Sequence, residues 1–209
     1  MLLSPCSGRL RAMKQTRLMT AAIAAAVLAL GAAGWLGVEL LRGQQQSAMF
    51  QVGGPFVLAS SAGGTVDSAT LAGKPYAVFF GFTHCPEVCP TTLYEMSSNL
   101  AALGEAAKDF RVFFITVDPA RDTVAAMKDY VANFDPRIEA LVPTDDQLKQ
   151  LASDFRVYYA KVPTSDGGYT MDHTATIFLF GRDGRFAGTI GYGEAAEMRQ
   201  AKLARLLKG

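Results

Sequence analysis

Two cysteines, Cys85 and Cys89, are separated by three residues. An apolar segment typical of a strand precedes them, and a segment typical of a helix follows. Residues four apart lie on one face of a helix, so both sulfurs can reach one metal ion or each other. A helix N-terminus also favours the thiolate that both chemistries need. The pair therefore predicts either a metal site or a redox dithiol, and two sulfurs alone do not decide between them.

The compartment of these cysteines depends on an apolar stretch near the N-terminus. Residues 18–38 form a 21-residue stretch without a charge, long enough to cross about 30 Å of hydrocarbon as a helix. The residues before it include four that are basic and none that is acidic: Arg9, Arg11, Lys14 and Arg17. The positive-inside rule then places the N-terminus in the cytoplasm and the chain after the stretch outside it.

This pattern predicts a single-pass protein of the inner (cytoplasmic) membrane. Residues 1–17 are the cytoplasmic basic N-terminus, 18–38 the transmembrane anchor, 39–52 a linker, and 53–209 one domain in the periplasm. A cleaved signal peptide is the alternative, because it shares the basic start and the apolar core. Its apolar region is normally about 7 to 15 residues long, which favours the anchor.

The charge balance bears on the partners. The chain has 20 basic and 19 acidic residues, but without the four basic residues at the N-terminus the balance is 16 against 19, about −3. This argues against a nucleic-acid partner, for which a basic patch is expected. Disulfides are common outside the cytoplasm. A Cys85–Cys89 disulfide would close only a short loop and add little stability, so a functional dithiol is preferred over a structural bridge.

Alternating patterns predict an α/β domain. Strands are predicted at 53–58, 63–66, 76–82, 111–117, 158–162, 175–180 and 185–190, and helices at 91–103, 123–134, 145–155 and 195–207. A polar loop is expected at 163–172, and a hairpin turn at Gly181-Arg-Asp-Gly184. Met96 is expected to fill the core. In such a fold the site lies at the C-terminal end of a strand, and Cys85 directly follows residues 76–82.

This order of elements, with a CxxxC pair at a helix start, resembles a thioredoxin-like fold with extra N-terminal and C-terminal hairpins. The closer resemblance is to the Sco/SenC family, whose hallmark Phe-Gly-Phe-Thr-His-Cys-Pro-x-x-Cys-Pro stands at residues 80–90. The segment Val117-Asp-Pro-Ala-Arg-Asp-Thr123 resembles a second family segment, and Asp172-His173 resembles its distal metal-ligand loop. The resemblance covers about residues 53–207.

The resemblance implies a membrane-anchored copper protein that serves assembly of the CuA site of cytochrome c oxidase. It implies copper, as Cu(I), Cu(II) or both, bound by Cys85, Cys89 and His173. The implied partners are cytochrome c oxidase subunit II with its CuA domain, a copper donor and a thiol reductant. Thiolates suit Cu(I), and a Cys2His set is also compatible with Cu(II). Without the resemblance, His173 would more often be a strand-edge histidine.

Two residues near the ligands are candidates for supporting roles. His84 precedes Cys85 and is expected to lie beside the site, where it either tunes the thiolate or is an exposed loop residue. Asp172 is expected to support the site or to contact a partner. Met171 offers a weak thioether ligand, although one methionine in a polar loop is more often only a loop residue.

Three polar residues follow the strand at 111–117, on the same rim as the cysteines. Asp118 and Arg121 are expected either to orient the site loop and bind a partner, or to form a local ion pair. Asp122 precedes Thr123 at a predicted helix start, and its expected role is that of an N-cap.

Three functions remain open from the sequence. The first is a copper chaperone, which is not an enzyme, and the second is a thiol-disulfide reductase that uses Cys85 and Cys89 as its redox dithiol. The third is a redox or copper sensor. The first two can share the same cysteines, because only thiolates bind the metal. Loss of His173 discriminates between them, since it should remove copper retention and leave dithiol exchange intact.

Overall fold

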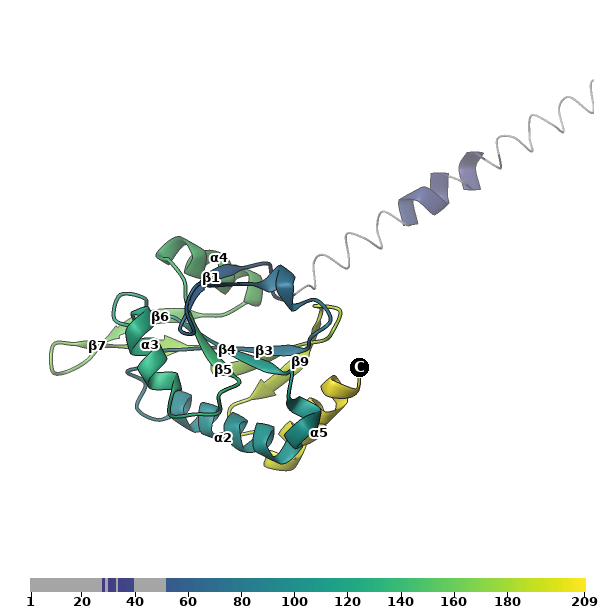
Figure 1. Cartoon of the computed structure of the whole chain (residues 1–209). Coiled ribbons are helices and arrows are strands. Elements are labelled where there is room, and N and C mark those ends of the chain that lie inside the picture. Colours follow the sequence, from purple (N-terminus) through teal and green to yellow (C-terminus); the bar gives the residue numbers. More distant parts are fainter. Residues whose placement is uncertain (1–27, 29, 33, 40–51) are drawn as a thin grey trace, which may run out of the picture. The chain divides into compact units, whose positions relative to one another are not determined.

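The computed structural model describes residues 28, 30–32, 34–39 and 52–209 (Figure 1). The chain divides into two compact units, 1–51 and 52–209. The described residues of the first unit are helical. Most of the predicted anchor at 18–38 lies outside the described residues. Among those that are described, no helix combines the length and the apolar character needed to cross a membrane.

The second unit is built on a mixed sheet of seven strands. Their order across the sheet is β2 (Thr65–Asp67), β1 (Val57–Ser60), β5 (Ile138–Val142), β4 (Arg111–Thr116), β3 (Tyr76–Gly81), β8 (Thr176–Phe180) and β9 (Phe186–Gly191). The three central strands β3, β4 and β5 are parallel, and the strands outside them pair antiparallel. A separate two-stranded sheet consists of β6 (Tyr159–Pro163) and β7 (Tyr169–His173).

Helices cover both faces of the seven-stranded sheet. The helices α2 (Val88–Leu103) and α5 (Ala196–Lys208) lie on one side, and α4 (Asp145–Phe155) lies on the other (Figure 1). The remaining helices are α3 (Val124–Val131) and two 3-10 turns, η1 (Ser68–Leu71) and η2 (Gly104–Ala107). This is the predicted α/β fold of thioredoxin-like type, with N-terminal and C-terminal hairpins formed by β1–β2 and β8–β9.

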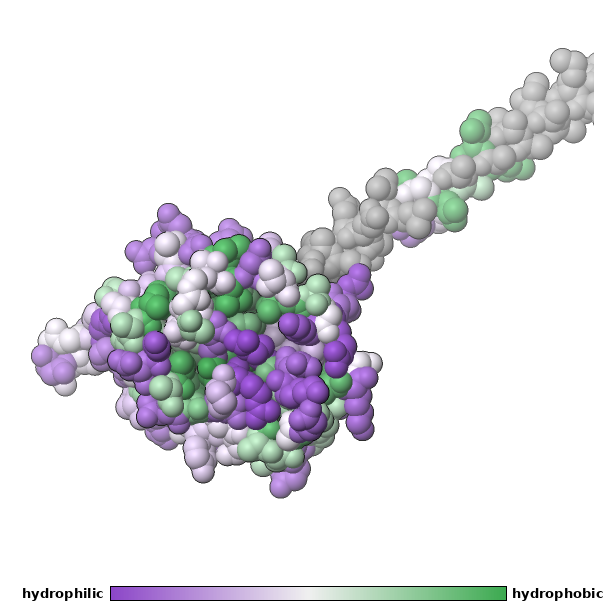
Figure 2. Space-filling view, in the orientation of Figure 1, coloured by the Kyte–Doolittle hydropathy of each residue, from purple (hydrophilic) through white to green (hydrophobic). Residues whose placement is uncertain are grey.

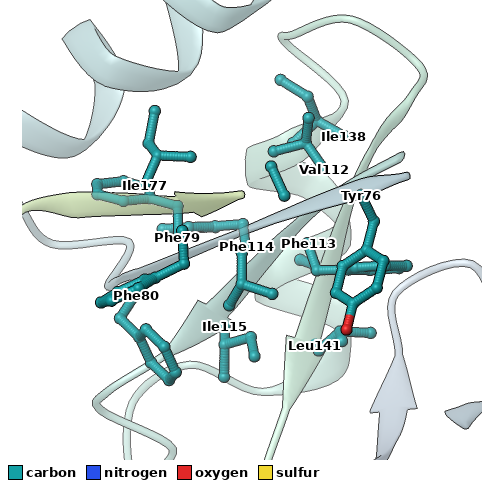
Figure 3. Close-up of a cluster of buried hydrophobic side chains, with 14 of the residues drawn as sticks. Tyr76, Phe79, Phe80, Val112, Phe113, Phe114, Ile115, Ile138, Leu141 and Ile177 are labelled. Carbon is teal, nitrogen blue, oxygen red and sulfur yellow. The ribbon is translucent and has the colours of Figure 1, made fainter. Parts of the chain in front are cut away.

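The two faces of β3 are buried in different halves of the core. Phe79 stacks on Phe114 of β4, with ring centroids 5.8 Å apart, on the face that α2 covers. Phe80 points to the other face, where its ring meets Phe155 of α4 at 5.2 Å. Figure 3 shows Phe79, Phe80 and Phe114 among aliphatic side chains of the neighbouring strands. Every residue of β3 is buried, which agrees with its continuous apolar run. Met96 is also buried in the core, as predicted.

The structure corrects several predicted elements. Strand β5 was not predicted, and α2 begins at Val88 rather than near Thr91. The strand predicted at 158–162 is β6, but the segment expected as a polar loop at 163–172 contains a turn and then β7, which pairs with β6 in a hairpin. The N-cap of α3 is Thr123, whose side chain accepts the backbone N–H of Ala126, so the prediction for Asp122 was wrong.

Candidate metal centre

The two cysteines lie where β3 passes into α2. Cys89 is in the first turn of α2 and is completely buried, whereas Cys85 precedes the helix and is half-buried. The backbone N–H of Cys89 donates to Cys85 Sγ at 3.3 Å. Both residues are free thiols in this structure. The connection from β3 to α2 therefore places one buried and one half-buried cysteine at the N-terminal end of the same helix.

His173 lies beside this pair, although it is 84 residues from Cys89 in the sequence. It ends β7, and its Nε2 lies 3.6 Å from Cys89 Sγ. Its Nδ1 is 3.2 Å from the carbonyl oxygen of Thr174, which can only accept a hydrogen bond. Nδ1 therefore carries the proton, and Nε2 keeps a free lone pair that faces the sulfurs. A backbone acceptor for the second ring nitrogen is the usual way in which proteins orient a histidine ligand.

Aromatic rings and one glycine complete the wall around these atoms. The ring of His173 meets Phe82 edge-on at 5.7 Å and Phe79 at 6.3 Å. Gly81 leaves the space for the buried sulfur. A Cβ at that position would lie 2.7 Å from Cys89 Sγ and 2.5 Å from Phe114 Cε2. The inner side of the site is thus apolar. This limits the access of water to the sulfurs and favours the binding of a soft metal ion.

The pKa values of the two thiols are shifted in opposite directions. The hydrogen bond with the Cys89 side chain lowers the pKa of Cys85 to about 4, and hydrogen bonds from the backbone act in the same direction, against the effect of burial. The pKa of Cys89 is raised, first by its hydrogen bond to Cys85, and then by burial and by the neighbouring negative charge. The reduced pair therefore carries one thiolate, centred on Cys85, around neutral pH.

His84 lies apart from the three ligand atoms. Its side chain is exposed, its Nδ1 is 3.0 Å from Thr83 Oγ1, and Asp122 Oδ1 is 3.8 Å away. Asp122 is fully buried and accepts hydrogen bonds from Thr83 and from Thr116 Oγ1. Asp122 thus joins the loop before Cys85 to the end of β4, a role that its position beside a helix start did not suggest.

The remaining candidates belong to β7 or contact it. Asp172 is exposed, while Met171 and His173 point to the opposite face of the strand. Met171 is buried in a strand and is not a loop residue. Asp118 is buried and pairs with Arg121, and it accepts a hydrogen bond from the hydroxyl of Tyr169. Tyr169 was missed from the sequence, where only the family's polar loop was expected.

The three ligand atoms fit a soft metal ion. Cys85 Sγ, Cys89 Sγ and the His173 nitrogen all lie within 4.8 Å of one another. Two thiolates and one imidazole suit Cu(I) and are compatible with Cu(II), and the apolar wall favours a low-coordinate ion. Fold and site together define a thioredoxin-like domain in which a CxxxC pair and one histidine form a group that could hold a metal ion.

Comparison with known proteins shows to which family this chain belongs. Residues 44–208 match the family described as SCO1/SenC, and the chain belongs to that family. The mitochondrial SCO2 homolog of Bos taurus is 37% identical over 195 residues, which cover 88% of this chain and 72% of the bovine protein. The matched region spans only 42% and 48% of two longer SCO1 homologs, from Arabidopsis thaliana and Homo sapiens.

Solved structures agree with the fold and with the metal. The structure of Bradyrhizobium japonicum ScoI, described as having copper bound, is 47% identical with a TM-score of 0.68 and covers 74% of this chain and 99% of that one. BsSco is 21% identical, with a TM-score of 0.59 over 75% of this chain and 95% of its own. At that identity the likeness shows the fold alone. BsSco is described as having a disulfide switch and as a member of the Sco family of cytochrome c oxidase assembly proteins.

Proposed function

We propose that this chain carries copper on Cys85, Cys89 and His173 and delivers it to the CuA site of cytochrome c oxidase subunit II. The observation that supports this most is the position of His173, whose unprotonated Nε2 faces Cys89 Sγ at 3.6 Å. A dithiol oxidoreductase does not require a distant imidazole at this position, whereas a metal site of two thiolates gains its third ligand from it. The copper-bound relative and the oxidase-assembly role stated for the Sco family support the cargo and the acceptor.

The arrangement suits a carrier that must also release its cargo. Three ligands leave a soft ion open to an incoming thiolate, and Cys85 and His173 are only partly buried, whereas Cys89 is completely buried. An acceptor sulfur can therefore enter beside Cys85 or His173 while the buried Cys89 still holds the ion. Release then proceeds by exchange of one ligand at a time.

Reduction of the acceptor's cysteines is a second candidate function, favoured by the unequal sharing of protons between the two thiols. The Cys85 thiolate would attack an acceptor disulfide to form a mixed disulfide, and Cys89 would then displace the acceptor thiol. The acceptor gains two electrons from the dithiol, one proton from the Cys89 thiol and one from water, and this chain ends with a Cys85–Cys89 disulfide. That product lacks the thiolates that copper needs, so carrier and reductase require the same reduced state.

Replacement of His173 separates the two functions. The full-length chain, reduced and loaded anaerobically, should retain one copper ion, and Cys85→Ser with Cys89→Ser should retain none. His173→Ala should weaken retention by more than about 100-fold, because even the partners of metal ligands are often worth 10- to 100-fold. Exchange with a small disulfide should continue in His173→Ala. Copper affinity unchanged by His173→Ala, measured by competition with a chelator, would exclude this site.

We also propose that the chain is anchored in the inner membrane, with its copper domain in the periplasm. The support is the uncharged stretch at 18–38 and the four basic residues before it. Reporter fusions after residue 50 should be active only as periplasmic reporters, and the mature protein should stay in the membrane fraction. A soluble periplasmic form that starts near Gly34 would identify the stretch as a signal peptide instead.

A further inference from the structure

The hairpin that carries His173 is a sheet of its own. Within residues 52–209, β6 and β7 pair only with each other and not with the seven-stranded sheet. Figure 1 shows the hairpin projecting from the body, and its hydrophilic tip is visible at the left of Figure 2. Backbone ladders therefore do not fix its position, and side-chain contacts must do so.

One side of the hairpin is not tightly packed against the body. A groove of about 320 Å³ lies between hairpin residues, among them Tyr159 and Lys161, and the residues Leu148 and Lys149 of α4. Packing against α4 thus leaves room for the hairpin to shift. The contacts that hold it must lie elsewhere along β7.

Those contacts gather on Tyr169, at the start of β7. Its hydroxyl donates to Asp118 Oδ1 at 3.0 Å, and Arg121 Nη1 donates to its backbone carbonyl at 2.9 Å. The guanidinium of Arg121 also lies over its ring, 3.8 Å from the centroid, and pairs with Asp118 through Nε. We call Asp118, Arg121 and Tyr169 the Tyr169 junction. It joins the loop after β4 to the strand that ends in His173.

The junction is built to be rigid. Asp118 is completely buried, and its carboxylate accepts hydrogen bonds from the guanidinium of Arg121 and the phenol of Tyr169, while its backbone N–H donates to Thr116 Oγ1. A buried carboxylate with these partners holds its geometry, because each lost hydrogen bond leaves charge without solvation. Arg121 is both stacked and hydrogen-bonded, an arrangement that lysine cannot reproduce.

The junction and the imidazole share one face of a short strand. Tyr169, Met171 and His173 alternate with outward residues, so Tyr169 and His173 point the same way, about 13 Å apart along the strand. At the other end of β7, Thr174 exchanges hydrogen bonds with the backbone of Tyr158 at 3.0 Å, which joins the two strands of the hairpin to each other. A shift at Tyr169 would therefore carry the hairpin as one unit, and His173 with it, relative to Cys89.

We propose that Tyr169 is a positioning residue for the metal site: its hydroxyl and ring, held by Asp118 and Arg121, keep His173 Nε2 within reach of the cysteine sulfurs. The inference rests on the proposed function, because it assigns His173 the task of a copper ligand. Within the described part of the chain, the hydrogen bonds and the ring contact of the junction join its three residues to one another and not to either cysteine, so it acts on copper retention through His173 and leaves the dithiol untouched.

The test compares Tyr169→Phe with Tyr94→Phe, which removes an exposed hydroxyl from α2. In the full-length reduced chain, Tyr169→Phe should weaken Cu(I) retention by about tenfold, as expected for a residue that orients a ligand. Tyr94→Phe should not change it. The reduction potential of the Cys85–Cys89 pair should be the same in both variants. A purely structural role for Tyr169 would not separate these two readouts.

A double variant that carries Tyr169→Phe and His173→Ala tests whether Tyr169 acts on copper through the imidazole. In that background Tyr169→Phe should have no further effect on copper retention, because the imidazole it positions is gone. Equal effects in both backgrounds, or wild-type copper retention in a folded Tyr169→Phe variant, would overturn the inference. If Tyr169→Phe fails to fold by circular dichroism, Arg121→Lys replaces it, with the same expected results. No loss of copper affinity in His173→Ala alone would instead contradict the proposed function.

Discussion

Alkylation of Cys85 in the reduced, metal-free chain should proceed at a rate that hardly changes between pH 6 and pH 8. Its pKa is lowered to about 4, so the thiolate fraction is already close to one at pH 6 and cannot rise further. An ordinary thiol, with a pKa of about 8.5, gains thiolate by nearly 100-fold over the same interval. The absolute rate will be modest, because a thiolate of low pKa is a weaker nucleophile.

Mass spectrometry of the iodoacetamide-treated chain locates the modification. Cys85 should be labelled and Cys89 should not, because Cys89 is completely buried and its pKa is raised. Cys89→Ser provides the control, since it removes the side chain that does most to lower the pKa of Cys85. The rate in that variant should depend more steeply on pH. A wild-type rate that increases tenfold for each pH unit would show that no such thiolate exists.

Gly81→Ala should damage stability and copper binding together. The new methyl group would lie 2.5 Å from Phe114 Cε2 and 2.7 Å from Cys89 Sγ, so a core ring or a ligand sulfur must move. Overpacking of this kind typically costs about 1 to 3 kcal/mol, which lowers the melting temperature of a domain of this size by roughly 2 to 12 °C. Copper retention should fall by at least about tenfold, because Cys89 Sγ is one of the three ligands.

Gly191→Ala is the matched control for this substitution. Gly191 ends β9, its backbone lies outside the left-handed region, and a Cβ there would meet nothing within 4 Å. Its unfolding free energy should stay within about 0.5 kcal/mol of wild type, with copper retention unchanged. Thermal denaturation and chelator competition measure both quantities. Equal unfolding free energies and equal copper retention in Gly81→Ala and Gly191→Ala would show that the close packing around Cys89 affects neither quantity.

The central strands and their helices could be predicted from the sequence because their signals are local. The continuous apolar run of β3 and the apolar spacing in α4 each specify one element, and the helix at 145–155 agrees at both ends. Strand β5 was missed because its five residues include a charged one, Glu139. That carboxylate is buried, but its partners Ser60 and Arg111 come from other strands.

The sequence named the candidate ligands but not the residues that support them. The spacing indicated Cys85 and Cys89, the family resemblance added His173, and the fold brings these three together. Strand β6 was predicted, but β7 was not, because its polar and glycine-rich surroundings are typical of a loop. The contact of Tyr169 with Asp118 joins residues 51 positions apart, and that of Asp122 with Thr83 joins residues 39 positions apart, so no local pattern indicates either of them.

X-ray absorption at the copper edge tests the central claim most directly. The full-length chain, reduced and loaded with one equivalent of copper, should show two sulfur ligands and one imidazole nitrogen. The nitrogen contribution should disappear in His173→Ala, and the sulfur contribution should disappear when Cys85 and Cys89 are both replaced by serine. A spectrum of oxygen and nitrogen ligands only, or one that His173→Ala leaves unchanged, would contradict a Cys2His copper site in this protein.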